Sequence, residues 1–301
     1  MKQHILITGA TGMIGRKLIA RLLLQGHQVS ILTRKPIKIK DVQVFLWNVE
    51  NGEIDKTCLE GVDTIVHLAG AGIADQKWTK ERKKQIIDSR VESTALIYKT
   101  IQEMNAPVKN FISSSASGYY GDRSDEILLE SSAPGDGFLA ECCILWEEAV
   151  DKGKALGLRI VKFRTGFVLG KKGGGLTALA RPISLFAGAA LGTGKQWVPW
   201  IHIDDIVAMY GDAIVDDSYE GAYNGCAPYP VSNEMLTKAV AKKLKRPVWP
   251  INVPEKVLEM ILGKMSVVVT TSTNLSAQKT LDKGFKFTYV QLEDALDAIY
   301  N

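Results

Sequence analysis

The glycines that follow the first apolar run of the chain have the spacing of a phosphate-binding turn. Residues 4–9 read HILITG, and residues 8–15 read TGATGMIG. In such a motif the first glycine permits a tight turn, the second lets the backbone approach a pyrophosphate, and the third allows close helix packing. The N–H groups at the start of the following helix bind the phosphates. The motif predicts a dinucleotide site, with an empty turn as the alternative, formed by Gly9, Thr11, Gly12, Met13, Ile14 and Gly15.

Two cations at the end of the second apolar run, residues 28–34, bear on the choice of cofactor. Sites for NAD usually place Asp or Glu here to accept from the ribose 2′-hydroxyl, whereas an arginine suits the 2′-phosphate of NADP. Arg34 and Lys35 therefore predict NADP(H) rather than NAD(H), and a solvated turn is the alternative interpretation.

A later apolar run, residues 63–70, ends in small side chains. Small residues at the carboxyl end of a central strand leave room for a cofactor that crosses the edge of the sheet. We therefore add Leu68, Ala69 and Gly70 to the predicted cofactor site, although an ordinary tight turn has the same composition.

Strands and helices alternate through the first half of the chain and must hold these residues in place. The predicted helices are 13–25, 80–104 and 137–156, and the predicted strands are 4–9, 28–34, 42–49, 63–70, 108–115 and 158–170. Strands separated by helices form right-handed βαβ units. This order predicts an α/β fold with a doubly wound parallel sheet of the Rossmann type.

The second half of the chain has a different texture. A glycine-rich stretch, 169–176, leads into an apolar segment, and further helices are predicted at 204–215, 232–245, 254–264 and 291–300. We predict a Rossmann domain of residues 1–170, to which residues 197–215 return. A smaller C-terminal α/β domain, residues 171–301, is expected to complete a substrate pocket.

Composition and charge exclude several classes of function. The 301 residues have a formal net charge of +4, which is too small and too dispersed for a nucleic-acid-binding protein. The N-terminus has no signal-peptide pattern, and no stretch approaches the ~18–20 apolar residues of a membrane span. The cysteines lack CxxC spacing, which predicts free thiols in a reducing compartment. We expect a cytoplasmic protein with a small-molecule substrate and no nucleic-acid or membrane partner.

Several motifs together resemble the extended short-chain dehydrogenase/reductase superfamily. TGATGMIG matches its glycine fingerprint, HLAGAG the motif after its fourth strand, FISSSASGYYGD its serine segment, and WIHIDDIV its downstream His-x-Asp segment. GYYGD, GTGKQWVPWIH and the terminal KGFKF resemble more narrowly an atypical "epimerase family" branch with a C-terminal domain of unknown function. The resemblance covers essentially the whole chain. It implies an NADP(H)-binding oxidoreductase or nucleotide-sugar epimerase-like protein that acts on a small polar substrate.

Enzymes of the superfamily that this chain resembles use a Ser or Thr together with a Tyr and a Lys four residues apart on one helix. The Tyr exchanges a proton with the substrate oxygen, and the Lys lowers the pKa of the Tyr and holds the nicotinamide ribose. At the matching positions this chain has Ala116, Phe138 and Cys142. The resemblance therefore also implies that the usual acid–base pair is absent.

Three interpretations follow from this absence. An enzyme with substitute groups would use Ser115, Tyr119 and Tyr120 as catalytic residues, with the Cys142 thiol as a further option if a neighbour lowers its pKa. Cys142 also lies in an apolar helical stripe, which favours a core position. The second interpretation is a non-catalytic NADP(H)-sensing or cell-division-related binding protein, because members of this branch are linked to cell or plastid division. The third is an interaction protein without cofactor, which the glycine fingerprint and Arg34 disfavour.

Other residues have both a functional and a structural interpretation. His202 has no His or Cys at metal-ligand spacing, so no metal site is predicted, and Asp204 or Asp205 is expected to cap the next helix. The loop 122–126 faces solvent and is a candidate lid. Helices 80–104 and 137–156 are compatible with a homodimer. Four more residues are either pocket groups or ordinary packing and ion-pairing residues: Trp197, Trp200, Arg90 and Arg164.

Overall fold

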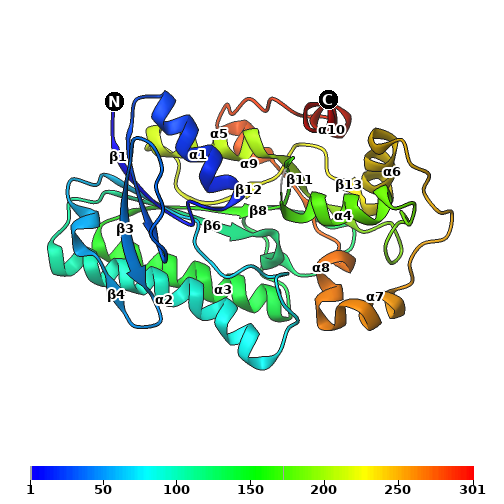
Figure 1. The fold of residues 1–301 in the computed structure, drawn as a ribbon, viewed down its shortest axis with the longest axis horizontal. Helices are drawn as coiled ribbons and strands as arrows, with labels where there is room; N and C mark the ends of the chain where they lie inside the picture. Colours follow the sequence, from blue (N-terminus) through cyan, green and yellow to red (C-terminus); the bar gives the residue numbers. More distant parts are fainter. Residues whose placement is uncertain (1, 172) are drawn as a thin grey trace.

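The computed structural model describes residues 2–171 and 173–301, and one large sheet organises the first half of the chain (Figure 1). Its strand order is β12-β8-β6-β5-β1-β2-β3-β4, and every neighbouring pair is parallel except β3 with β4. The order reverses at β1, which makes the sheet doubly wound. The strands of the structure are β1 His4–Thr8, β2 Gln28–Thr33, β3 Val42–Asn48, β4 Glu53–Ile54, β5 Thr64–His67, β6 Asn110–Ala116, β7 Ile127–Leu128, β8 Arg159–Thr165, β9 Phe167–Leu169, β10 Trp197–Val198, β11 Trp200–His202, β12 Gly221–Gly225, β13 Val231–Ser232 and β14 Asn274–Leu275.

Helices cover both faces of this sheet, so its central strands are buried on both sides. In Figure 1, α1 and α5 lie above the sheet, and α2 and α3 lie below it. All residues of β1 and β5 are buried, which explains why their sequences are almost continuously apolar. The helices are α1 Met13–Leu24, α2 Lys80–Met104, α3 Phe138–Asp151, α4 Gly174–Ser184, α5 Ile203–Val215, α6 Asn233–Leu244, α7 Glu255–Leu262, α8 Val267–Thr270, α9 Gln278–Asp282 and α10 Leu292–Tyr300.

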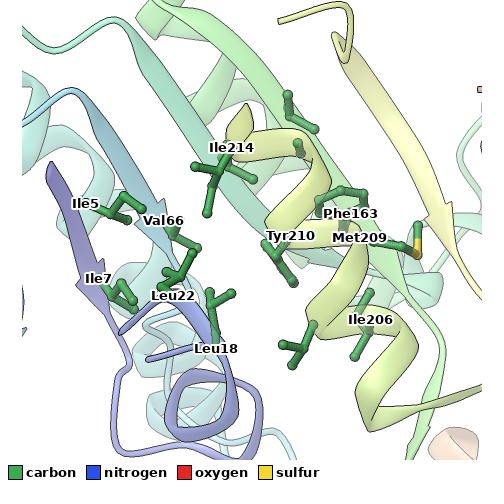
Figure 2. Close-up of a cluster of buried hydrophobic side chains, with 14 of the residues drawn as sticks. Ile5, Ile7, Leu18, Leu22, Val66, Phe163, Ile206, Met209, Tyr210 and Ile214 are labelled. Carbon is green, nitrogen blue, oxygen red and sulfur yellow. The ribbon is translucent and has the colours of Figure 1, made fainter. Parts of the chain in front are cut away.

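The core above the sheet joins α1 and α5 to the central strands (Figure 2). Leu18 and Leu22 are one helical turn apart on α1 and point onto the sheet, and Ile206, Tyr210 and Ile214 do the same from α5. This packing holds the start of α1, where the glycine motif lies, against a rigid platform. The Rossmann fold predicted from the sequence is confirmed.

A smaller region follows the sheet and has its own apolar core, built mainly from α4, α6 and α10. The predicted strand 158–170 divides at Gly166, because β9 leaves the large sheet and pairs with β11. Gly166 lies against the carbonyl group of Pro199, where a side chain has no room. Residues 197–215 thus include both β11, which pairs with β9 in a separate two-stranded sheet, and α5, which packs on the large sheet.

The expected cap of α5 was wrong. His202, and not an aspartate, caps this helix, since its Nδ1 accepts a hydrogen bond from the N–H of Asp204 at 3.2 Å. The Asp205 carboxylate points instead to the C-terminal segment, where it accepts from the N–H groups of Thr288 at 2.8 Å and Tyr289 at 3.0 Å. Asp205 therefore ties α5 to the segment that precedes α10.

Asp205→Ala is expected to lower the free energy of unfolding by about 1–3 kcal/mol, because two partly buried N–H groups lose their acceptor. Urea denaturation measures this loss. Asp204→Ala is the matched control. The half-exposed Asp204 carboxylate pairs with Lys17 and lies 3.6 Å from His202 Nδ1, and its loss should cost less than about 1 kcal/mol. Equal losses in the two variants would contradict the role given to Asp205.

Candidate functional site

The glycine turn between β1 and α1 is built as the sequence motif predicts. Gly9 has a φ of +66°, a conformation that side chains other than glycine rarely adopt. An ideal Cβ on Gly9 would lie 2.6 Å from the carbonyl carbon of Leu68, and one on Gly15 would lie 2.6 Å from the Gly9 oxygen. The turn therefore touches the end of β5 on one side and the first turn of α1 on the other. Both close approaches require glycine.

A chain of hydrogen bonds fixes the ends of β1 and β5 beside this turn. Thr8 Oγ1 accepts from the N–H groups of Leu68 at 3.2 Å and Ala69 at 3.1 Å, so its own proton goes to His67 Nδ1 at 2.8 Å. The other ring nitrogen of His67 lies 3.1 Å from Ser93 Oγ of α2. Complete burial, with the nearby Arg90 charge, lowers the pKa of His67 to about 3. His67 is therefore a neutral connector.

The N-terminus of α1 is open to a ligand. No side chain caps it, and its first turn has no acidic residue, so neither a hydroxyl nor a carboxylate competes for its N–H groups. A cavity of about 550 Å³ lies beside it, between α1 and the loop that precedes α4. The cavity is lined by Thr11, Met13, Arg16, Lys17, Gly170, Lys171, Gly173, Gly174 and Ile203. Dipole and side-chain cations both favour an anion here.

Arg34 and Lys35 lie at the same edge of the sheet as the glycine turn. β1 and β2 run parallel with Thr8 opposite Leu32, which puts Arg34 just beyond the carboxyl end of β2. Both cations are exposed, and within the described residues Arg34 has no ion pair or hydrogen bond. Its guanidinium is therefore available to a ligand.

Two of the candidate catalytic hydroxyls form hydrogen bonds inside the protein core. Ser115 is 2% exposed and donates to Glu147 Oε1 at 2.7 Å. Tyr120 is fully buried, donates to Asn224 Oδ1 at 2.7 Å and accepts from Arg164 Nη1 at 2.9 Å. Burial raises the pKa of Tyr120, although Arg164 opposes this rise. Neither hydroxyl is placed to exchange a proton with a ligand in the cleft.

Arg164 belongs to a buried ion network and is not a free cation. It donates to both oxygens of Glu147, from Nε at 2.8 Å and from Nη2 at 3.0 Å. Lys162 Nζ also lies 3.2 Å from Glu147 and 2.7 Å from Asp151. Of the two interpretations given to Arg164, the ion pair is therefore the one that the structure contains.

The third candidate, Tyr119, is half-buried, and its hydroxyl has no partner within the described residues. The Arg164 guanidinium carbon lies 3.4 Å from the centroid of its ring, which fixes the ring from one face. Tyr119 is thus the only one of the three predicted hydroxyls that is not used inside the described fold.

The positions where a Tyr and a Lys were missing are filled by apolar packing. Phe138 packs edge-on against Trp78 at a centroid distance of 4.8 Å, and Lys83 Nζ lies 4.6 Å over the Phe138 ring. Cys142 is 2% exposed, and burial raises its pKa, against the opposing effect of Arg90. A reactive thiolate is therefore disfavoured, and the predicted core stripe on this helix is present.

The remaining candidates have structural roles. Trp200 is buried and donates to the Tyr229 carbonyl at 2.8 Å, whereas Trp197 donates to Asp125 at 2.8 Å in the candidate lid. That loop, 122–126, is largely exposed as expected, but it is tied down. The Arg123 N–H donates to Ser272 O at 3.1 Å, so the loop is attached to the C-terminal region.

Within the described residues, no group of three His, Cys, Asp or Glu side chains is arranged to hold a metal ion. Over residues 2–171 and 173–301, none of the helices has the length and apolarity that crossing a bilayer demands. All four cysteines are buried and unpaired.

Sequence reasoning missed two features of the cleft, the Thr8–His67–Ser93 chain and the environment of Arg90. Polar residues at the carboxyl ends of two adjacent buried strands, Thr8 and His67, were a usable signal for the first. Arg90 was named only as a general candidate, because its neighbours come from α3 and from a loop far away in the sequence.

Comparisons with known proteins agree with this geometry. Residues 5–224 match the NAD dependent epimerase/dehydratase family, and residues 253–299 match a domain of unknown function (DUF1731). The chloroplastic epimerase family protein SDR39U1 homolog of Arabidopsis thaliana is 36% identical over 302 residues, which cover 97% of this chain and 85% of that protein. Epimerase family protein YfhF of Bacillus subtilis is 34% identical over 299 residues, which cover 98% and 97% of the two chains.

A solved structure is similar over the whole chain. The human epimerase family protein SDR39U1, crystallised with NADPH, superimposes with a TM-score of 0.87 at 27% identity and covers 99% of both chains. The glycine turn, the doubly wound sheet and the match over residues 5–224 lead to one conclusion. This chain belongs to the NAD dependent epimerase/dehydratase family, in the atypical branch that ends in DUF1731.

Proposed function

We propose that this protein binds NADP(H) at the glycine turn of β1 and α1. The observation that carries the proposal is the turn itself, where Gly9 and Gly15 fit spaces that a Cβ would fill and the N-terminus of α1 is uncapped. The residues present fit the cofactor: helix N–H groups and nearby cations suit the pyrophosphate, and the exposed Arg34 suits the 2′-phosphate. The similarity to a human protein crystallised with NADPH supports the same cofactor.

The proposed reaction class is oxidoreductase or epimerase-like action on a small polar substrate. Bound NADP(H) supplies or accepts a hydride in such chemistry. The chain itself binds and orients the dinucleotide along the ends of β1, β2 and β5. A proton would have to be exchanged through Tyr119 or through water, because Ser115 and Tyr120 are engaged in the interior.

Arg34→Ala is expected to weaken NADPH binding by about 10- to 100-fold and to change NADH binding by less than about twofold. The reason is that only NADPH has a 2′-phosphate for the guanidinium to bind. Calorimetric titration of cofactor-free protein with each dinucleotide measures both affinities. Lys38→Ala, another exposed cation of the same loop, is the matched control and should leave both affinities unchanged.

Two results would contradict this assignment. Equal loss of NADPH and NADH affinity in Arg34→Ala would mean that the residue does not recognise the 2′-phosphate. Absence of binding of either dinucleotide to the unaltered protein would mean that the glycine turn has no cofactor, and an interaction protein would then replace the proposal.

A second candidate function is non-catalytic NADP(H) sensing. One observation favours it: Ala116, Phe138 and Cys142, which the resemblance matches to the catalytic Ser, Tyr and Lys positions, have neither a hydroxyl nor an ammonium group. A panel of aldehydes and ketones, followed by loss of NADPH absorbance, separates the two. Turnover with any member supports the enzyme, whereas tight NADPH binding without turnover across the panel supports the sensor.

A further inference from the structure

Arg90 is a buried cation without a counter-charge. It lies on α2, is 7% exposed, and forms no ion pair with any carboxylate among the described residues. Its Nη1 donates to the carbonyl groups of Ile86 at 2.8 Å and Ala71 at 3.1 Å. Its Nε is buried without a partner among the described residues. The hydrogen bonds of the guanidinium all come from Nη1, so no described residue accepts one from Nη2, which is not among the buried atoms without a partner. A buried guanidinium in this condition is costly unless a ligand supplies acceptors.

The position of Arg90 places the Nη end of its guanidinium, including the unpaired Nη2, beside the cofactor cleft. An ideal Cβ on Gly70 would lie 3.0 Å from the guanidinium carbon, so the side chain lies directly against Gly70. Gly70 follows Leu68 and Ala69, the residues just after β5 that touch the Gly9 turn. The Arg90 guanidinium and the glycine turn therefore adjoin the same short segment, residues 68–70.

Arg90 also reaches the helix that would carry the missing lysine. Its guanidinium carbon lies 4.8 Å from the centroid of the Trp146 ring on α3, and Trp146 is one helical turn after Cys142. The Arg90 charge acts on the thiols of both Cys142 and Cys143. The resemblance to the superfamily matches Cys142 to the position of its lysine, so Arg90 places a positive charge near that position from another helix.

We infer that Arg90 supplies, from α2, the cation that is absent at Cys142, and that it binds the nicotinamide mononucleotide half of NADP(H). This inference rests on the proposed function. The ribose hydroxyls and the phosphate of that half are hydrogen-bond acceptors, and the phosphate adds the missing negative charge. Arg90 is then a cofactor-positioning residue for the nicotinamide end, whereas Arg34 serves the adenosine end.

The test compares two probes, NADPH and adenosine 2′,5′-bisphosphate, which lacks the nicotinamide half. Arg90→Met is expected to weaken NADPH binding by about 10- to 100-fold and to leave the bisphosphate affinity within about twofold of the unaltered protein. Calorimetric titration measures both. Retained bisphosphate binding also shows that the variant still folds around the adenosine end.

Arg82→Met separates ligand binding from support of the loop. Arg82 is another buried α2 arginine, and its Nη2 donates to the Gly72 carbonyl at 2.6 Å in the loop that Arg90 also holds. Arg82→Met should leave the ratio of the NADPH and bisphosphate affinities unchanged. A similar loss of NADPH in Arg82→Met, or loss of both probes in Arg90→Met, would assign Arg90 to the fold alone.

A second substitution tests whether a cation at position 142 of α3 can replace Arg90 of α2. Cys142→Lys placed in Arg90→Met should restore at least a tenth of the unaltered NADPH affinity, since it returns an ammonium to α3. A double variant that binds the bisphosphate normally but shows no recovery for NADPH would overturn this replacement. If the unaltered protein binds neither probe, the proposed function fails first; if Arg90→Met binds both probes normally, only this inference fails.

Discussion

Gly9→Ala is expected to weaken NADPH binding by more than about 100-fold and to lower the free energy of unfolding by about 2–5 kcal/mol. Two costs add at this position. An alanine is strained at a φ of +66°, and its Cβ would lie 2.6 Å from the backbone of Leu68 and 2.8 Å from the N atom of Ala69. Relief of this overlap is expected to move Leu68 and Ala69, which follow β5, away from the turn. Urea denaturation and calorimetric titration measure the two effects.

Gly52→Ala is the matched control for Gly9→Ala. Gly52 has nearly the same φ, +67°, but an added Cβ there meets nothing within 4 Å. It should lose only about 1–2 kcal/mol of stability and retain NADPH affinity. An unchanged NADPH affinity in Gly9→Ala would contradict the assignment of the site to this turn.

The Rossmann half of the fold was accessible to sequence reasoning because its elements have simple local signals. The strands around β1 are apolar on both faces. Helix α1 begins at Met13, within the glycine motif, as the sequence predicts. Helix α2 was predicted as 80–104 and has these bounds in the structure. Its ends are marked by Thr79, which accepts from the Arg82 N–H, and by Asn105 in the left-handed conformation.

Elements whose signals are non-local were missed. Helix α4 begins with two glycines, which are poor helix formers, and it is stabilised by Leu176 and Ile183 packed in the C-terminal core. Strand β12, sequence GAYNG, has no strand-like composition, and its pairing with β8 places it at the sheet edge. Tertiary contacts decide both elements, so no local pattern predicts them.

The candidate site also has one part that local sequence signals predict and another part that distant contacts decide. The cofactor turn depends on backbone geometry that glycine spacing specifies, so a motif predicts it. The catalytic candidates depended on which way side chains point across the sheet. Ser115 and Tyr120 were plausible by position, but partners on α3 and β12, Glu147 and Asn224, take their hydroxyls into the core. Those partners are distant in sequence.

Glu147→Ala is expected to lower the free energy of unfolding by about 3–5 kcal/mol. Glu147 is 5% exposed, and its carboxylate interacts with Arg164, Lys162 and Ser115. Its removal leaves the buried Arg164 without an anion. Glu148→Ala, on the exposed side of the same helix, should change stability by less than about 0.5 kcal/mol. Urea denaturation of the two variants measures the difference, and similar losses would contradict a structural role for the network.

Replacement of both Glu147 and Arg164 tests whether the charges of this pair or the volume of its side chains stabilise the fold. Glu147→Met combined with Arg164→Met removes the anion and its main cation together, while Lys162 keeps Asp151 at 2.7 Å. Apolar replacement of a whole buried pair is often neutral or stabilising, whereas removal of one partner is not. The double variant is therefore expected to be more stable than Glu147→Ala. A double variant that is less stable would mean that packing around Tyr120 dominates the network.

The same carboxylate gives the network a pH dependence whose sign is fixed. Burial by itself raises the pKa of Glu147, but the hydrogen bonds and charges of Arg164 and Lys162 outweigh it and hold the pKa below the ordinary value of 4.5. A carboxyl with a lowered folded-state pKa stabilises the fold above its unfolded pKa and loses that contribution as the pH falls through the folded pKa. Glu147→Gln cannot ionise, so the stability difference between the unaltered protein and this variant should be largest near neutral pH and shrink progressively below about pH 4.5. Because the other acidic groups are common to both proteins, the difference isolates Glu147, and a gap that stays constant or widens on acidification would show that its charge does not stabilise the fold.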